Sequence, residues 1–342
     1  MKKTGFLLLL LLSFGCKSST AIINNQNLGE NLIPKASKSD VIMASTSKII
    51  KRYVVTSKKL KSIVSFLASD DLQGRDTGSE GIEKAAIYIE NSIKQNNIKP
   101  YFKTYRDSFN LKGIDGYNIV GFIEGNDEIL KNEVVIIGAH YDHIGLAKKV
   151  NDDVIANGAN DNAAGTSGVL EIANYFAATK NNKRSIIIAL FSAEEKGLKG
   201  SEHLAKKLKE QNINLYTMLN FEMIGVPFTD RPYDAFLTGY DLSNMSAKIN
   251  EYTNSNLTGF SEVSKKYDLF KHSDNFAFYQ EFKLPCQTIS SCDLSNYDYY
   301  HHVDDEADKL DYNHMASLIN KVIPAIESIC NTPTKEIKMT NE

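Results

Sequence analysis

Three short apolar segments, each followed closely by acidic residues or histidine and then glycine, are the feature that most constrains this chain. The segments are 134–137, 185–190 and 218–221, and apolar side chains dominate all three. Continuous apolar runs of this length are typical of strands buried on both faces of a sheet. Because open α/β sheets build their sites at the carboxyl ends of parallel strands, we expect the polar residues after these strands to form one site.

The residues that follow the three segments have side chains that bind metal ions: His140, Asp142, His143 and, after a polar loop, Asp161; Glu194 and Glu195; and Glu222. Imidazole and carboxylate groups are common zinc ligands. Adjacent carboxylates repel one another unless a cation lies between them. Each segment alone has a simpler interpretation, such as a turn with a surface histidine or a solvated helix start. The three segments together favour a metal site.

A fourth polar segment, residues 298–306, precedes the last predicted helix and contains His301 and His302 among acidic residues. In isolation, a histidine pair in such a loop is most often a solvated surface feature.

Segments whose apolar residues recur at helical spacing alternate with the predicted strands along most of the chain. This spacing predicts helices over 57–68, 79–98, 165–178, 198–208 and 310–329, with Pro324 kinking the last one. A further strand is predicted over 117–123. Alternating strands and helices predict an α/β domain, a three-layer sandwich with a mostly parallel central sheet flanked by helices.

The first 16 residues have the pattern of an export signal. Three residues that include two lysines precede an apolar stretch, 7–12, that is too short to span a bilayer, and Gly15-Cys16 follows. This pattern resembles a bacterial lipoprotein signal that leaves Cys16 as the acylated first residue, although Ser13 and Phe14 depart from the usual residues. Ordinary signal-peptide cleavage is the alternative. In both cases the protein is exported, and the lipoprotein interpretation anchors it in the bacterial cell envelope.

The rest of the chain is divided by composition. Residues 17–46 are rich in Ser, Asn and Lys without sustained periodicity, which predicts a flexible tether. Residues 47–332 are long enough for one large domain with a sizeable core, and 333–342 are expected to form a tail. The net charge of −3, with signs interspersed, gives no basic cluster, so we expect no nucleic-acid partner.

The spacing of the cysteines predicts a disulfide and argues against one type of zinc site. Cys286 and Cys292 are close together in an exported chain, which predicts a local disulfide and leaves Cys330 unpaired. The chain has no paired C-x-x-C spacing, which argues against a zinc ribbon.

Taken in order, these segments resemble metallopeptidase family twenty-eight, which contains zinc-dependent aminopeptidases and glutaminyl-cyclase-like enzymes. The resemblance covers nearly the whole predicted domain, and no single motif decides it. The matching segments begin at residue 67 with LASDDLQGRDTGSEGIEKAAIYIENSIKQNNIKP and continue with GAHYDHIG, GANDNAAGTSGVLEIA, FSAEEKGLKGSEHLA, NFEMIG and YHHVDDEADKLD.

The resemblance implies a set of ligands for two zinc ions. His140 and Glu222 would bind the first zinc, and Glu195 and His301 would bind the second. Asp161 would bridge the two ions. His301 is chosen over its neighbour His302 because a tyrosine precedes the ligand in the family, and His302 remains an alternative.

The resemblance also implies two catalytic roles. Glu194 would be the general base, and Asp142 would orient the imidazole of His140. Two zinc ions would polarise the scissile carbonyl and lower the pKa of a bound water. Glu194 would take the proton of that water and transfer it to the leaving amine. Glu222 differs from the family pattern, because aminopeptidases of the family commonly have Asp at this position. The longer side chain of Glu affects how well the first metal position is filled.

Three functions follow from the resemblance. The first is a two-zinc aminopeptidase acting on peptides, with specificity in the loops at 226–234 and 256–275. The second is a one-zinc glutaminyl cyclase, and the absence of Trp argues against it because tryptophans line the pocket of such cyclases. The third is a non-catalytic surface lipoprotein on the same fold, which would be supported by a lost ligand or base. No such loss is found in the sequence.

Overall fold

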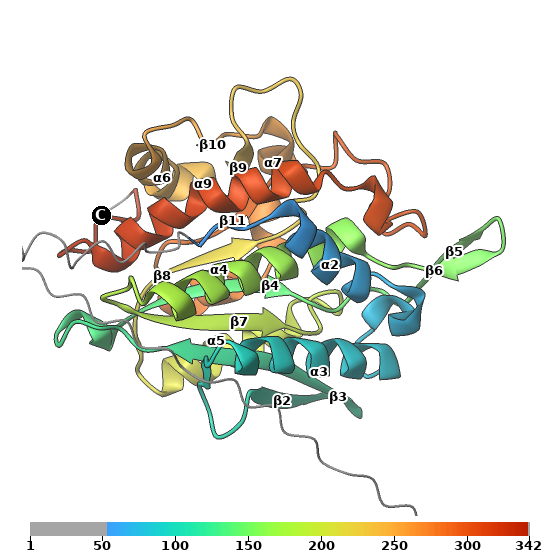
Figure 1. Cartoon of the computed structure of the whole chain (residues 1–342), viewed down its shortest axis with the longest axis horizontal. Coiled ribbons are helices and arrows are strands. Elements are labelled where there is room, and N and C mark those ends of the chain that lie inside the picture. Colours follow the sequence, from blue (N-terminus) through green and yellow to red (C-terminus); the bar gives the residue numbers. More distant parts are fainter. Residues whose placement is uncertain (1–52, 341–342) are drawn as a thin grey trace, which may run out of the picture. The chain divides into compact units, whose positions relative to one another are not determined.

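The computed structural model describes residues 53–340, and these residues belong to one compact unit (Figure 1). The predicted signal segment, Cys16 and the tether lie outside the described residues. Among the described residues, no helix is long and apolar enough to cross a membrane.

The described residues contain a nine-stranded sheet at the centre of the domain, with the order β1-β3-β7-β4-β8-β11-β9-β10 and β2 paired to β3. Its strands are β1 (Lys99–Pro100), β2 (Arg106–Leu111), β3 (Ile114–Ile123), β4 (Glu133–His140), β7 (Ser185–Phe191), β8 (Asn214–Phe221), β9 (Ala235–Leu237), β10 (Thr258–Gly259) and β11 (Cys286–Ser290). The four central strands, β7, β4, β8 and β11, are parallel to one another. β3 and β9 pair antiparallel at the two sides of this group, so the sheet is mixed.

Helices cover both faces of the sheet, which confirms the predicted α/β sandwich (Figure 1). The helices are α2 (Ser57–Leu67), α3 (Glu80–Gln95), α4 (Gly165–Thr179), α5 (Lys199–Glu210), α6 (Met245–Thr253), α7 (Glu262–Lys266), α8 (Asn275–Phe282) and α9 (Tyr312–Asn331). Side chains alternate along β4: Val135 and Ile137 pack with α2, α3, α4 and α9, whereas Val134 and Ile136 pack with α5 and α8. A continuous apolar strand is therefore required, because both of its faces are buried.

Local signals explain where several helices begin. Thr56, Ser79 and Asp311 precede α2, α3 and α9, and their side chains accept hydrogen bonds from backbone N–H groups of the first turn. The five predicted helices agree with the structure to within three residues at each end. The helices α6, α7 and α8, between residues 245 and 282, were not predicted from the sequence.

The segment predicted as a tail contacts the domain. Ile337 is buried, and its backbone N–H donates a hydrogen bond to the hydroxyl of Tyr216 at 2.8 Å. Met339 forms a β-bridge with Ser243. The folded domain thus includes residues 333–340.

The predicted Cys286–Cys292 disulfide is wrong, because both residues are free buried thiols, as is Cys330. Cys286 begins β11, and Cys292 lies two residues beyond the end of that strand. A strand advances about 3.3 Å per residue, whereas a disulfide requires Cα atoms within about 7 Å of each other. The extended backbone holds the two cysteines too far apart.

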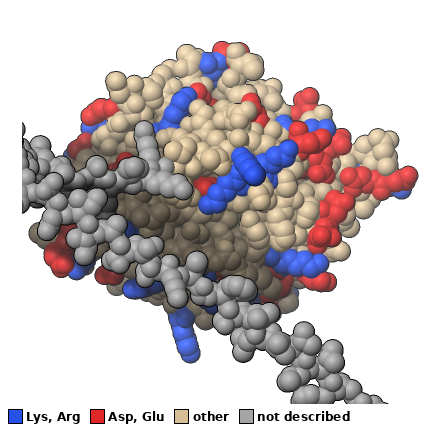
Figure 2. Space-filling view, in the orientation of Figure 1, with Lys and Arg blue, Asp and Glu red and all other residues tan. Residues whose placement is uncertain are grey.

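On the face shown in Figure 2, basic side chains of the described residues are interspersed with acidic ones. A two-stranded hairpin of β5 (Leu146–Val150) and β6 (Asp153–Ile155) projects from the domain beyond the sheet (Figure 1).

Candidate metal centre

The predicted site residues lie together because three adjacent strands end at the same edge. β4 lies between β7 and β8 and is parallel to both. His140, the last residue of β4, is level with Phe191, the last residue of β7. Glu222 directly follows β8, and the Glu194-Glu195 pair begins three residues after β7. Sheet order alone therefore brings together side chains that are more than 80 positions apart in the sequence.

One group of possible metal ligands consists of His140, Asp161 and Glu222, whose ligand atoms lie within 4.8 Å of one another. The Nε2 atom of His140 is 3.3 Å from Oδ1 of Asp161. His140 is fully buried, and its Nδ1 atom lies 3.2 Å from the backbone carbonyl of Asp142. This contact leaves Nε2 directed at the carboxylates.

A second group consists of Asp161, Glu195, His301 and His143, again with ligand atoms within 4.8 Å of one another. The Nε2 atom of His301 is 3.0 Å from Oε2 of Glu195 and 3.3 Å from Oδ2 of Asp161. His302 is not part of this group, because its Nδ1 atom accepts the backbone N–H of Asp304. Of the two candidate histidines, the structure brings only His301 into the site.

Asp161 belongs to both groups, and its two carboxylate oxygens face different histidines: Oδ1 faces His140 and Oδ2 faces His301. Within the described part of the chain, the Nε2 atoms of His140 and His301 are buried and have no hydrogen-bond partner. Buried polar atoms normally have partners, and imidazole nitrogens surrounded by carboxylates are typical zinc ligands. The residues fit two metal ions that share one bridging carboxylate.

Charges within the site shift the pKa values of its acids. Burial alone would raise the pKa of Asp161, but the close imidazoles of His140 and His301 hold it well below its usual range. Burial raises the pKa of Glu194 well above its ordinary value, despite the opposing charge of His140. Burial also raises the pKa of Glu222 to about 7. Since several acids cannot all be ionised in a buried site without cations, this electrostatic arrangement favours bound metal.

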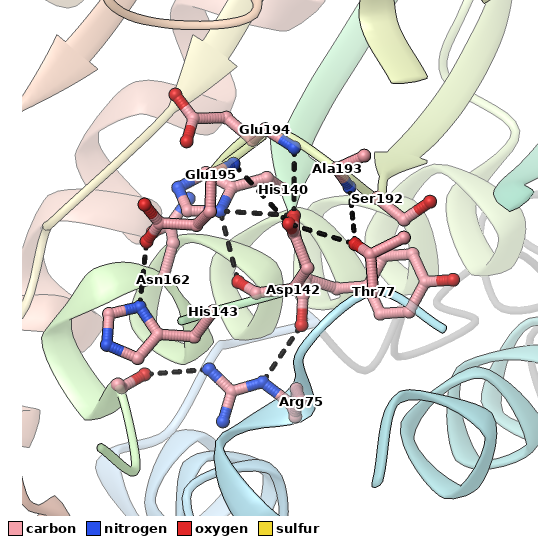
Figure 3. A network of polar contacts seen from close by, with 12 residues as sticks. Arg75, Thr77, His140, Asp142, His143, Asn162, Ser192, Ala193, Glu194 and Glu195 are labelled. Atoms are coloured by element: carbon pink, nitrogen blue, oxygen red, sulfur yellow. Dashed lines mark hydrogen bonds and ion pairs between the residues drawn. The ribbon is translucent and has the colours of Figure 1, made fainter. Parts of the chain in front are cut away.

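Asp142 fixes the turn that presents Glu194 and Glu195 (Figure 3). Its Oδ1 atom accepts the backbone N–H of Glu194 at 3.2 Å, and its Oδ2 atom accepts that of Glu195 at 3.4 Å. The hydroxyl of Thr77 donates to Oδ2 at 3.2 Å and accepts the N–H of Ala193 at 2.9 Å. The carboxylate of Asp142 is 3.7 Å from Nδ1 of His140, so its hydrogen bonds go to the turn, and the role in orienting His140 stays a prediction.

Residues 118–326 match the sequence model of Peptidase family M28. The chain belongs to this family. The resemblance inferred from the sequence motifs is thereby confirmed.

Curated relatives of this M28 chain have names that describe peptidases. It is 25% identical over 215 residues to a "Probable zinc metalloprotease" of Pyrenophora teres f. teres, covering 60% of this chain and 43% of the relative. It is 26% identical over 225 residues to a "Probable leucine aminopeptidase" of Trichophyton verrucosum, covering 64% and 57% respectively. The match spans about half the length of these relatives.

Solved structures share the fold at low sequence identity. The Legionella pneumophila LapA aminopeptidase has a TM-score of 0.64 and 20% identity, covering 92% of this chain and 81% of that one. The Porphyromonas gingivalis glutaminyl cyclase has a TM-score of 0.62 and 14% identity, covering 80% of this chain and 99% of that one. The M28 fold therefore accommodates both a peptidase and a cyclase.

Arg75 is a residue of the M28 site that sequence reasoning did not single out. It is fully buried and donates hydrogen bonds to four backbone carbonyls, those of Leu67, Tyr141, Asn157 and Gly158. Burial lowers its pKa to about 10, which leaves it charged at neutral pH. It therefore fastens the loop after β4 to the loop before Asp161. In the sequence, Arg75 could have been found as the arginine that follows Gly74 in the matching segment that begins at residue 67.

Arg75→Met is expected to destabilise the metal-free protein by about 3 kcal/mol, because four buried carbonyls lose a charged donor. In a domain of this size, that corresponds to a fall in Tm of roughly 6–12 °C. Thermal and urea unfolding would measure the change. Arg106→Met is the control: this arginine binds Glu83 and Glu90 at the surface, and its loss should cost about 1 kcal/mol. Equal losses in the two variants would contradict the role of Arg75.

Ser273 and Asp274 were not predicted individually, although both lie in the loop 256–275 that was expected to determine specificity. The hydroxyl of Ser273 donates a hydrogen bond to Oε2 of Glu222 and accepts one from the side chain of Asn220 at 2.9 Å. Asp274 is fully buried beside them, and burial raises its pKa to about 7. Both residues precede α8 in a segment whose position depends on the pairing of β8 with β11, which no local pattern encodes.

A pocket opens beside Glu222, and its wall is mostly apolar and neutral. The lining residues are Glu222, Met223, Phe236, Thr238, Leu269, His272, Ser273, Thr288, Ser290, Cys292, Leu294 and Tyr300. Three of them fall in the predicted specificity loop 256–275, and none falls in 226–234.

Proposed function

We propose that this protein is a zinc-dependent aminopeptidase that hydrolyses the N-terminal peptide bond of peptides and holds two zinc ions. The observation that carries the proposal is the sharing of Asp161 by two ligand groups, one with His140 and Glu222 and the other with Glu195 and His301. The names of the curated relatives, a zinc metalloprotease and a leucine aminopeptidase, support it.

In this function the bound metal supplies Lewis acidity, which polarises a carbonyl and makes water more acidic. Glu194 accepts a proton from the attacking water while the oxygen of that water forms a bond to the scissile carbonyl carbon. The C–N bond then breaks, and Glu194 returns the proton to the leaving amine. Two facts support this role: the carboxylate of Glu194 belongs to neither ligand group, and His140 and Glu222 lie close enough to shift its pKa.

The chain's other residues hold these groups in position. Asp142 and Thr77 fix the turn that carries Glu194, and Ser273 fixes the carboxylate of Glu222. The pocket beside Glu222 accepts the side chain of the N-terminal residue, and its wall, which includes Phe236 and Leu269, favours an apolar one.

The second candidate is glutaminyl cyclisation at a single zinc. Glutaminyl cyclases of Porphyromonas gingivalis and Bacteroides thetaiotaomicron share this fold, with a TM-score of 0.62 for each. The lack of Trp in this chain and the presence of a second complete ligand group both favour the peptidase.

Product analysis by mass spectrometry distinguishes the two functions. The zinc-loaded protein is incubated with two peptides that differ only in their first residue, leucine or glutamine. We expect release of free leucine and a shortened peptide, with activity lost to a chelator and restored by zinc. Loss of ammonia from the glutamine peptide, with the leucine peptide intact, would replace the peptidase by the cyclase. No reaction with either peptide would favour the non-catalytic alternative.

We further propose that the protein is exported and anchored in the cell envelope through a lipid on Cys16, which lies outside the described residues. Gly15-Cys16 at the end of the apolar stretch supports this. A fatty-acid analogue should label the wild type and not Cys16→Ser, as read by gel fluorescence after expression in a bacterial host. Equal labelling of both proteins, or of neither, would contradict the anchor while leaving export open.

A further inference from the structure

His143 lies in the second ligand group, although the family resemblance gave it no role there. It follows β4 by three residues, and its ring is fully buried. Its Nδ1 atom is 2.9 Å from Oε1 of Glu195 and 3.7 Å from Oδ2 of Asp161. Its ring and that of His301 meet edge to face, with centroids 5.5 Å apart. The Nδ1 atom of His143 thus lies among the donor atoms of the predicted ligands of the second group.

The separations between these donor atoms lie within about 0.4 Å of those expected in one coordination shell. Ligands at 2.0–2.2 Å from a tetrahedral zinc lie about 3.3–3.6 Å from each other. The contacts of His143 with the two carboxylates are 2.9 and 3.7 Å, and those of His301 are 3.0 and 3.3 Å. The two imidazoles therefore have equivalent relations to Glu195 and Asp161.

The backbone holds the ring of His143 in this orientation. The N–H of His143 donates to the carbonyl of Arg75 at 3.3 Å. Gly158 packs directly against the ring, and a Cβ atom there would lie 2.5 Å from Cγ of His143. Arg75 also donates to the carbonyl of Gly158 at 2.9 Å, so a single residue fixes both sides of the ring. A side chain fixed in this way is preorganised to bind a metal.

We propose that Nδ1 of His143 is a fourth side-chain ligand of the zinc held by Asp161, Glu195 and His301. The inference rests on the proposed zinc-dependent function. Four protein ligands are typical of zinc sites that are closed and retain their metal, whereas three ligands are typical of open ones. The zinc of this group is therefore held more tightly than the zinc of His140, Asp161 and Glu222.

The alternative role for His143 is a hydrogen bond from Nδ1–H to Glu195, which would make it a positioning residue. Two substitutions separate these roles. His143→Ala removes both the ligand and the donor. His143→Asn keeps an N–H donor near the place of Nδ1 but replaces the imidazole nitrogen with a far weaker zinc ligand. His302→Ala is the matched control, since this neighbouring histidine points to Asp304.

The test measures zinc affinity by chelator competition on the zinc-loaded protein, together with the visible spectrum of the cobalt-substituted protein. Loss of a hydrogen bond to a ligand typically costs 10–100-fold in metal affinity. We expect His143→Ala and His143→Asn each to weaken the tighter zinc more than about 100-fold and to alter the cobalt spectrum. His302→Ala should change neither, and melting of the metal-free proteins checks that all variants are folded.

Three results would overturn the proposal. If His143→Asn keeps wild-type affinity within a few-fold while His143→Ala loses 10–100-fold, His143 is a positioning residue. If both variants keep two zinc ions with wild-type affinity and spectrum, His143 has no role in metal binding, and the proposed function is untouched. If the wild type binds no zinc, the inference and the proposed function fail together.

Discussion

Glu194→Gln is expected to lower kcat for peptide hydrolysis by roughly 10²–10⁴, the usual cost of losing a general base. Glutamine keeps the size of the side chain but cannot accept the proton of the attacking water. Glu194 belongs to neither ligand group, so zinc content should stay at the wild-type level. KM should be nearly unchanged, because contacts made in the ground state survive. Steady-state kinetics with a leucyl substrate, alongside metal analysis, measures both quantities.

Glu195→Gln is the matched control for this prediction, because it changes the same side chain one residue later. Glu195 lies within 3.0 Å of both His143 and His301, so its loss should weaken zinc binding, and added zinc should restore part of the activity. Zinc should not rescue Glu194→Gln. If Glu194→Gln loses zinc and Glu195→Gln keeps it, Glu194 is the zinc ligand and Glu195 is the general base. If both variants hydrolyse the substrate at the wild-type rate, the assignment of the catalytic site to these residues is wrong.

Asp161→Ala is expected to release both zinc ions, because Asp161 is the one residue common to the two ligand groups of the described chain. A bridging carboxylate also reduces the repulsion between two cations, so its loss affects both positions. Zinc binds only the native state, and at 100 times its Kd a ligand adds about 2.7 kcal/mol of stability. The variant should lose this stabilisation, so its Tm should not respond to added zinc.

Asp107→Ala provides the comparison for Asp161→Ala. Asp107 is equally buried, but it pairs with Lys207 and Asn118 away from the metal centre. Its loss should lower Tm while both zinc ions remain bound and continue to stabilise the fold. If Asp161→Ala retains both zinc ions at full occupancy, Asp161 does not bridge them.

The central fold could be predicted from the sequence because its strands are buried on both faces. A strand such as β4 must be apolar between its ends, and its polar C-terminal residue then marks the edge where the site lies. Residues at the end of such strands or directly after them, His140 and Glu222 among them, were predicted for this reason and lie together in the structure. Their chemical roles remain predictions.

Other features depend on contacts between distant segments, which local patterns do not encode. Asp274 reaches the site only because β11 pairs with β8 and draws α8 with it. The two strands beyond β11 were not predicted, since β9 and β10 are only three and two residues long. The disulfide prediction failed for a related reason: cysteine spacing contains no information about whether the intervening chain is extended, as it is from Cys286 to Ser290.

The most direct test of the two-zinc account is the zinc content of the purified wild-type domain, measured by elemental mass spectrometry after removal of free metal. The account predicts two zinc ions per chain, one for each ligand group around Asp161. A single zinc would contradict it and favour the cyclase, and an absence of zinc would contradict any metal-dependent function at this site.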